Sequence, residues 1–158
     1  MPILIIFAVA GLLYLLQDQI YRRFWSRHLH ADVEFTDHFI HEGESTELIE
    51  TLSNGKILPL PWVYVKFKIH CNGKVEHYRS DLFSIRFYQK IRRKIPFQFE
   101  KRGVYTIRGI DLISNNLFIT SKYVKVIEDG ATMVVYPRLI STEEFQIPFQ
   151  KMMGDIIT

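Results

Sequence analysis

The chain has 158 residues, which gives room for one domain and a short appendage. Its net charge is only +3, and its single cysteine, Cys71, excludes an internal disulfide and a zinc site built on paired cysteines. The aromatic content of 14%, with 12 Phe and 8 Tyr, favours β-strands. We therefore expect a small β-rich domain whose fold does not depend on an oxidising compartment.

An uncharged apolar run, PILIIFAVAGLLYLL, occupies residues 2–16. With Met1 and the turn at residues 17–21 added, a helix here would be about 31 Å long, close to the roughly 30 Å hydrocarbon core of a bilayer. Aromatic and arginine side chains follow at once, as is typical of a membrane–water interface. We predict that residues 1–24 form a transmembrane anchor in contact with membrane lipid.

Two other interpretations of this run compete with an anchor. A cleaved signal peptide needs a basic segment before the apolar run and a small-residue site behind it, and neither is present in the right place. A core helix of a soluble protein should have a polar face, which this run lacks. Arg22, Arg23 and Arg27 follow the helix and no basic residue precedes it, so the positive-inside bias predicts a single-pass protein of the cell membrane with a cytoplasmic C-terminal module.

After His28 the hydrophobic period changes to two, which indicates strands. The first strand is expected at residues 29–35. Further strands are expected at residues 45–53, 62–69, 74–79, 84–88, 90–100, 104–113, 123–127 and 132–136. Turn signals separate them, among them Asn54-Gly55, Asn72-Gly73, residues 101–103 and residues 114–116. The last two strands are expected to pair with each other around Glu128-Asp129-Gly130.

This spacing, with no helical pattern between the strands, predicts a mainly β fold. The expected architecture is an antiparallel β-sandwich over residues 29–138, preceded by one transmembrane helix. Residues 139–158 break the pattern, since Pro148 prevents a long helix and large apolar side chains have no evident place to be buried. We expect this segment to be a tail or a junction to a missing C-terminal domain.

No motif of an active site is recognisable. His28 and His30 should share a strand face and His38 and His41 lie near the first turn, but neither pair has the further ligands that a metal needs. Glu42 and Glu44 flank a turn and should be solvated. A phosphate-binding loop, a nucleophile elbow and a zinc-peptidase motif are all missing from the sequence. We predict no catalytic, cofactor-binding or metal-binding residue and no enzymatic activity.

Charge is unevenly distributed along the chain. Residues 28–55 contain seven acidic residues and no Lys or Arg, whereas residues 79–108 contain nine basic residues and two acidic ones. The basic candidates for contact with an anionic surface are Arg86, Lys90, Arg92, Arg93, Lys94, Lys101 and Arg102. Interleaved aromatic residues also fit a nucleic-acid platform, or simply a solvated face over a core of Phe. Because a membrane anchor is predicted in the same chain, we expect these basic residues to contact lipid or protein, and we expect no nucleic acid.

Several stretches, in this order, are similar to a known family. They are the apolar helix, residues 42–44 (EGE), 58–63 (LPLPWV), 101–105 (KRGVY), 111–112 (DL) with 116–118 (NLF), and 135–137 (VYP). Together they resemble the N-terminal half of the bacterial family called domain of unknown function 58. That family usually has two N-terminal helices, whereas this chain has one, and its signature stretch lies further C-terminal and is absent here.

The resemblance implies a membrane-anchored β-sandwich that is usually followed by a von Willebrand factor A-like domain. It also implies a protein partner, an ATPase of the MoxR type, and a role in assembly at the bacterial envelope. No ligand role transfers to any residue of this chain. The sequence therefore predicts a non-enzymatic, membrane-tethered interaction module. The alternative is an accessory part of a larger envelope enzyme or adhesion protein whose functional site lies in a missing C-terminal domain.

Overall fold

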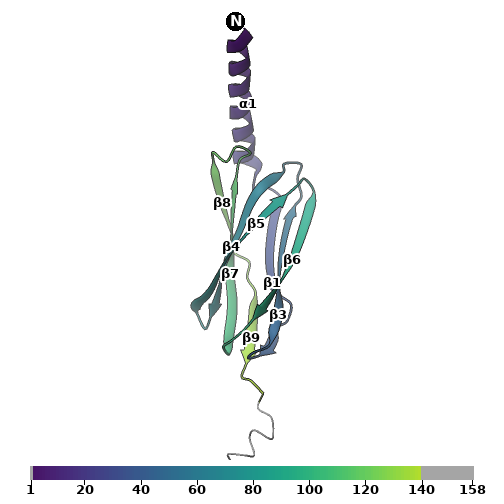
Figure 1. The fold of residues 1–158 in the computed structure, drawn as a ribbon, viewed down its shortest axis with the longest axis vertical. Helices are drawn as coiled ribbons and strands as arrows, with labels where there is room; N and C mark the ends of the chain where they lie inside the picture. The colour runs from purple at the N-terminus through teal and green to yellow at the C-terminus, as the bar shows by residue number, and fades with distance from the viewer. Residues whose placement is uncertain (1, 140–158) are drawn as a thin grey trace, which may run out of the picture.

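The structure is a computed structural model that describes residues 2–139 of the chain. Within that range it consists of one helix, α1 (Pro2–Phe24), followed by a β-sandwich (Figure 1). The strands are β1 (Leu29–Phe35), β2 (Phe39–His41), β3 (Ser45–Asn54), β4 (Leu60–Cys71), β5 (Lys74–Ile85), β6 (Gln89–Gln98), β7 (Gly103–Asn115), β8 (Lys122–Ile127) and β9 (Thr132–Tyr136).

Two sheets pack face to face. One has the strand order β1-β3-β6, and the other has the order β2-β9-β7-β4-β5 with β8 paired to β7. Among residues 2–139 every strand pair is antiparallel except β2 with β9, which is parallel. The predicted antiparallel sandwich with an N-terminal apolar helix is confirmed, with this parallel pair as an exception.

The core lies between the sheets and follows the period-two pattern. In β4 the inward residues Val63, Val65, Phe67 and Ile69 are all buried, whereas Lys68 between them is exposed. In β1 the inward positions begin at its first residue and continue at every second one. Successive side chains of a strand point to opposite faces of the sheet, so the pattern alone places these residues correctly.

The prediction of a separate strand at residues 84–88 was wrong. Ser84 and Ile85 complete β5, which stays paired with β4 up to Leu60, and residues 86–88 form the connection to β6. The predicted strand at residues 74–79 ended before the polar residues Ser80 and Asp81. Asp81 instead continues the strand, because its carboxylate meets arginines from β5 and β6.

The prediction that the last two strands pair with each other was also wrong. β8 pairs with the second half of β7 and β9 with the first half. β7 has 13 residues, enough to pair with two shorter strands placed end to end. The connection between them crosses close to β7: the amide of Ile107 donates to the carbonyl of Ala131 at 2.8 Å, and a Cβ on Gly130 would collide with the Ile107 carbonyl oxygen. Only glycine permits that approach.

Three smaller expectations need correction or lie outside the description. Ser114 and Asn115 belong to β7 and not to a turn. His28 precedes β1 with a φ of 50°, so it does not share a strand face with His30. The expected tail or junction at residues 139–158 lies outside the described residues from position 140 on.

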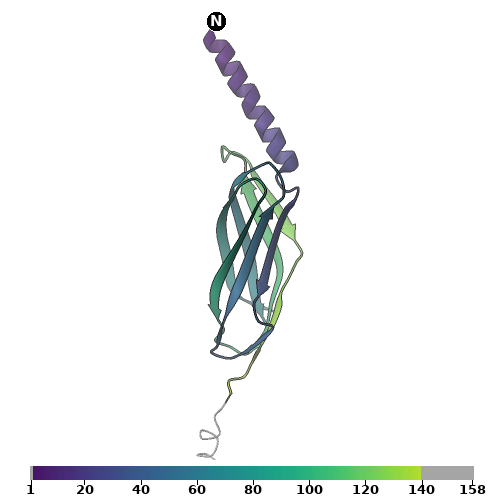
Figure 2. The same cartoon turned by 90° about the vertical axis from the view of Figure 1, so that its right-hand side faces the viewer.

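The helix and the last described residues lie at opposite ends of the sandwich (Figures 1 and 2). Strands β3, β5 and β7 end at the helix end, and β4, β6 and β8 begin there. The connections at residues 55–59, 86–88 and 116–121 therefore surround the base of α1. This end of the molecule combines the apolar helix with three loops, which makes it the candidate site.

Candidate functional site at the helix end of the sandwich

The last turn of α1 and the residues just after it are part of the sandwich core. Tyr21 and Trp25 are only 2% and 6% exposed, and both belong to the continuous hydrophobic cluster of the two sheets. The Tyr21 hydroxyl donates to the Pro59 carbonyl at 2.9 Å, and the Trp25 ring stacks on Tyr123 with 5.8 Å between centroids. The sequence suggested that these aromatics mark the membrane interface. The structure instead uses them to attach the helix to the module.

Asp18 makes a second attachment, one turn earlier in α1. Its Oδ1 accepts hydrogen bonds from Asn116 Nδ2 at 3.1 Å, Ser121 Oγ at 2.9 Å and the Tyr123 hydroxyl at 3.0 Å. Its other oxygen, Oδ2, pairs with Arg22 at 3.2 Å. Hydrogen bonds to a charged acceptor are stronger than neutral ones. Asp18 therefore ties the helix to the β7–β8 loop.

Two lysines bind the backbone carbonyls at the end of the helix. Lys56 Nζ donates to the carbonyl of Trp25 and, at 2.9 Å, to that of Arg27, and Lys125 Nζ donates to the Ser26 carbonyl at 3.3 Å. Cations are stabilising at a helix C-terminus. Burial, and secondarily the charge of Lys125, lower the pKa of Lys56 to about 8. The helix end is thus fixed by one side chain from the β3–β4 connection and one from β8.

An open groove lies between the helix and the β3–β4 connection. It has a volume of about 520 Å³, and its walls are mostly apolar. The lining residues are Ile20, Phe24, Arg27, His28, Lys56, Ile57, Leu58 and Pro59. The groove combines aliphatic walls with basic side chains at the level where the helix leaves the sandwich.

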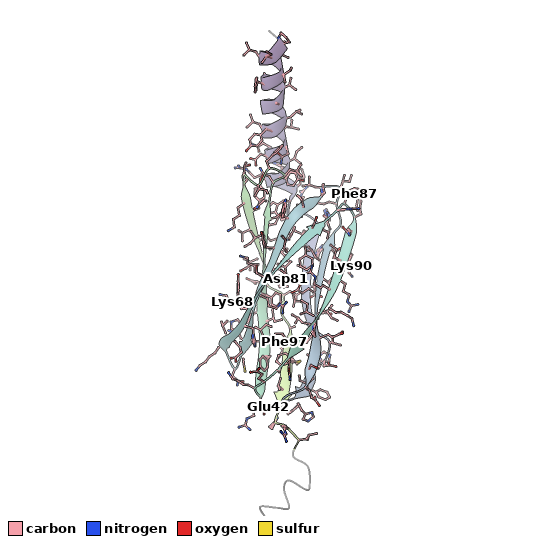
Figure 3. All side chains as sticks on the ribbon, viewed as in Figure 1. Glu42, Lys68, Asp81, Phe87, Lys90 and Phe97 are labelled. Carbon is pink, nitrogen blue, oxygen red and sulfur yellow. The ribbon has the colours of Figure 1, made fainter. Side chains whose placement is uncertain are left out.

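The loops at this end also expose large apolar side chains. Ile57 in the β3–β4 connection and Phe87 and Tyr88 in the β5–β6 connection are exposed, and Figure 3 places Phe87 at the helix end of the sandwich. The β7–β8 loop adds Leu117, Phe118 and Ile119. These exposed residues were not predicted as a group, because they come from separate connections and no local period links them.

The seven predicted basic residues do not form one patch. Arg86 lies in the connection at the helix end, and Lys90 lies near the start of β6. Arg92 and Lys94 follow on the outer face of β6. Lys101 and Arg102 precede β7 at the opposite end, the end at which Figure 3 labels Glu42. Ten strand residues extend about 33 Å, so the set spans the length of the sandwich.

Three of these basic residues have acidic partners. Lys94 pairs with Glu47 at 2.6 Å and Lys101 with Glu76 at 2.7 Å. Arg93 has the opposite strand parity from Arg92 and points toward β5 while staying 43% exposed, 3.5 Å from Asp81 and with its guanidinium 4.4 Å from the centre of the Phe83 ring. Of these three pairs, only Lys94 with Glu47 joins the basic segment 79–108 to the acidic segment 28–55, so the two segments compensate each other only in part.

A buried acid that the sequence analysis missed lies next to Arg93. Glu50 is 1% exposed and lies opposite Arg93 in the register of β3 and β6, while Asp81 and Arg79 approach from the other sheet; its two carboxylate oxygens are buried without a hydrogen-bond partner among the described residues. Burial, and then the charge of Asp81, raise the pKa of Glu50 to about 7. The alternation of the strand could have revealed this buried acid, because Glu50 stands between Leu48 and Leu52 on the buried face of β3.

In the described part of the chain, no group of three or more His, Cys, Asp or Glu side chains is placed to hold a metal ion. The Glu50 cluster contains two carboxylates and two guanidinium groups, and it closes the edge between β5 and β6. Its geometry fits a structural contact between the sheets.

Comparisons with known proteins give only distant likeness. No protein-family model matches the chain, and no curated protein matches it. Among solved structures, the CARDB domain of PF1109 from Pyrococcus furiosus, in a complex with di-metal ions, is 15% identical with a TM-score of 0.49, covering 70% of this chain and 96% of that one. AT1g01470 from Arabidopsis thaliana is 13% identical with a TM-score of 0.44, covering 70% and 81%.

The ASH/PapD-like domain 7 of human CEP192 is 16% identical with a TM-score of 0.40, and the match covers 68% of this chain and 87% of that domain. Likeness at this level carries no inference about ligand, partner or activity. One helix within residues 2–139, α1, is long and apolar enough to cross a bilayer. The chain is therefore a β-sandwich that carries, fixed to one end, a helix of membrane-spanning length.

Proposed function

We propose that this protein is a non-enzymatic, membrane-tethered interaction module, with α1 as a single transmembrane span and the sandwich in the cytoplasm. One observation carries the proposal. The apolar side chains of α1 are exposed along the whole run, as at Phe7 with 72% exposure, while Tyr21 and Trp25 at its base are buried in the sandwich. The helix is thus part of the fold but has no protein surface to cover it within residues 2–139.

The exposure of these apolar side chains distinguishes a membrane anchor from the core helix of a soluble protein. A core helix of a soluble protein would be buried, and none of the most apolar window of α1 is buried. Soluble monomers rarely expose an apolar surface of this size, whereas hydrocarbon covers it at no cost. A leader peptide that is removed would not normally supply core residues such as Tyr21 to the mature domain. The contacts at the base of α1 favour a retained anchor.

The family resemblance supplies the partner in this proposal. It suggests that the module works with an ATPase of the MoxR type in an assembly process at the envelope. The sandwich offers surfaces for protein contact, such as the outer face of β6, where Lys90 and Arg92 are both exposed. A basic face of this kind suits a partner with an acidic surface.

Membrane fractionation tests the anchor. The full chain should stay with membranes after an alkaline carbonate wash. A double variant, Ile6→Lys with Leu13→Lys, should move to the soluble fraction, because both positions are exposed on α1 and distant from Tyr21. The matched control, Ile6→Leu with Leu13→Ile, keeps the apolar surface and should stay with the membranes. Release of the unmodified chain by the wash would refute the anchor.

Orientation and partner need separate tests. A cysteine placed at the exposed Phe39 should react with a membrane-impermeant maleimide only after the cells are opened, because this position would be cytoplasmic. The native Cys71 is buried and should stay silent. Labelling in intact cells would contradict the proposed orientation and place the sandwich outside the cytoplasm. Purified MoxR-type ATPase from the same organism should bind the reconstituted chain, and a binding curve no different from that of empty vesicles would remove this partner.

A further inference from the structure

The β7–β8 loop exposes three large apolar side chains in succession. Leu117, Phe118 and Ile119 are 48%, 62% and 57% exposed. Residues 115–121 contain no charged side chain, and the first charge after the loop is Lys122 at the start of β8. An uncharged apolar tip is an unusual way to end a hairpin that faces water, where turns are normally polar.

Contacts with α1 show how far along the helix the β7–β8 loop reaches. The Tyr14 hydroxyl lies 2.9 Å from Thr120 Oγ1, and the Tyr14 and Phe118 rings have centroids 5.8 Å apart. Tyr14 belongs to the uncharged run of residues 2–16 and lies four residues before Asp18, about 6 Å further along the helix axis. Figure 1 shows the loop rising beside the lower part of α1. Its tip therefore lies at the level of the apolar helix surface.

A set of side-chain hydrogen bonds holds the β7–β8 loop beside the helix. Asn116 is fully buried, and its Oδ1 accepts hydrogen bonds from the amides of Thr120 at 2.8 Å and Ser121 at 3.3 Å, while its Nδ2 donates to Asp18. Ile119 has a φ of 59°, a conformation that β-branched residues rarely adopt. Such strain persists only where the surroundings impose it. The conformation of the exposed tip is thus defined by the hydrogen bonds of Asn116.

We propose that Leu117, Phe118 and Ile119 insert into the same leaflet that α1 enters, so that the sandwich contacts the bilayer at a second point. The inference rests on the proposed function, in which α1 spans the membrane. The tip contacts lipid in this proposal because it continues the apolar surface of α1 at the same position along the helix axis and carries no charge. Because the helix is docked to the sandwich, the two tilt together, and a second contact with lipid would fix that common tilt against the membrane plane.

Depth-dependent quenching in vesicles tests the insertion on the full chain. Cys71 is replaced by Ala, and single cysteines at Phe118, Leu12 and Phe39 are labelled with the fluorophore NBD. The positive control is Leu12, in the helix, and the matched negative control is Phe39, an exposed aromatic at the far end of the sandwich. Each chain is reconstituted with lipids brominated near the glycerol or near the methyl end, and iodide is the aqueous quencher.

The expected result is that the label at position 118 is quenched severalfold more by lipid brominated near the glycerol than by iodide, while the label at position 39 is quenched by iodide alone. Lipid quenching at position 12 with iodide quenching at 118 would overturn the inference and leave the anchor standing. Iodide quenching at position 12 would overturn the anchor itself. Shielding of position 118 from both quenchers would mean that protein, such as a second copy, covers the loop, which also overturns the inference.

Discussion

Replacing Glu50 with Gln should change how the stability of the sandwich depends on pH. Glu50 is buried between the sheets, and its pKa is raised from an ordinary value of 4.5 to about 7. In the unfolded chain the carboxyl ionises near its ordinary pKa, so the folded state holds its proton more tightly. The stabilisation is therefore fully present below pH 4.5 and is lost as the pH rises through about 7.

The size of the effect follows from the same two values. At about 1.4 kcal/mol per pH unit, the difference corresponds to roughly 3 kcal/mol as an upper limit between pH 4.5 and pH 8. Because Gln carries no charge at any pH, Glu50→Gln should lose this part of the dependence and be more stable than the unmodified chain at pH 8 by up to this amount. At the acidic end of the range the two proteins should be nearly equal.

The assay is urea unfolding of the full chain in a nonionic detergent, followed by tryptophan fluorescence from about pH 4.5 to about pH 8.5, which brackets both pKa values. The difference between the two proteins is the quantity of interest, since other titrating groups affect both. Glu47→Gln is the matched control: it lies on the same strand but pairs with Lys94 at the surface, where such pairs are worth at most about 1 kcal/mol. Equal pH dependence in the Glu50→Gln and unmodified proteins would refute the reasoning.

Three further predictions concern the core, the helix attachment and the basic face. Val65→Asp should unfold the sandwich and remove its near-ultraviolet dichroism, because an unpaired buried charge costs several kcal/mol, whereas Lys66→Asp on the outer face should leave the spectrum intact; equal effects would contradict the assigned faces. Tyr21→Phe should lower the free energy of unfolding in detergent by about 1 kcal/mol, because the Pro59 carbonyl loses its donor, and an unchanged value would mean that this hydrogen bond contributes nothing to the attachment. Lys90→Ser with Arg92→Ser, in a form that starts at residue 17, should weaken low-salt binding to anionic vesicles about 10- to 30-fold, at about 1 kcal/mol per basic residue. If neither the two substitutions nor added salt changes the binding, this face is only exposed to solvent and does not contact lipid.

Strand faces were predictable because they depend on local parity. The alternation in β4 placed Val65 and Phe67 in the core without any knowledge of the partner strands. The same parity places Glu50 inside, between Leu48 and Leu52. It was missed because the acidic residues of this segment were considered only as a charge run and their strand parity was not used. A charge run gives the composition of a segment, whereas parity gives the direction of each side chain.

Strand pairing at the C-terminal side was not predictable from the pattern. Both β8 and β9 have the period of a strand and are separated by a turn signal at Asp129-Gly130. What decides the pairing is the length of β7 and the close crossing of Gly130 over Ile107, which are contacts between distant parts of the chain. A local turn signal favours a hairpin, but here hydrogen bonds to β7 satisfy both strands instead.

The attachment of the helix was hidden for a similar reason. Tyr21 and Trp25 fit an interfacial aromatic belt as well as a core, because both environments take amphipathic rings. Asp18 fits the headgroup region as well as a hydrogen-bonded socket. Only the fold brings Asn116 and Ser121, about a hundred residues later, next to it.

The rigid attachment affects how the module would meet a partner. β7 runs the length of the sandwich, and its 13 residues extend about 43 Å. With α1 fixed at one end, Pro137 and the other last described residues lie at the far end, away from the helix (Figure 2). A flexible tether would let a partner approach from any side. In the membrane-anchored arrangement proposed above, a docked helix holds the far end of the sandwich about 40 Å from the bilayer, and a partner that binds there must reach that far from the membrane surface.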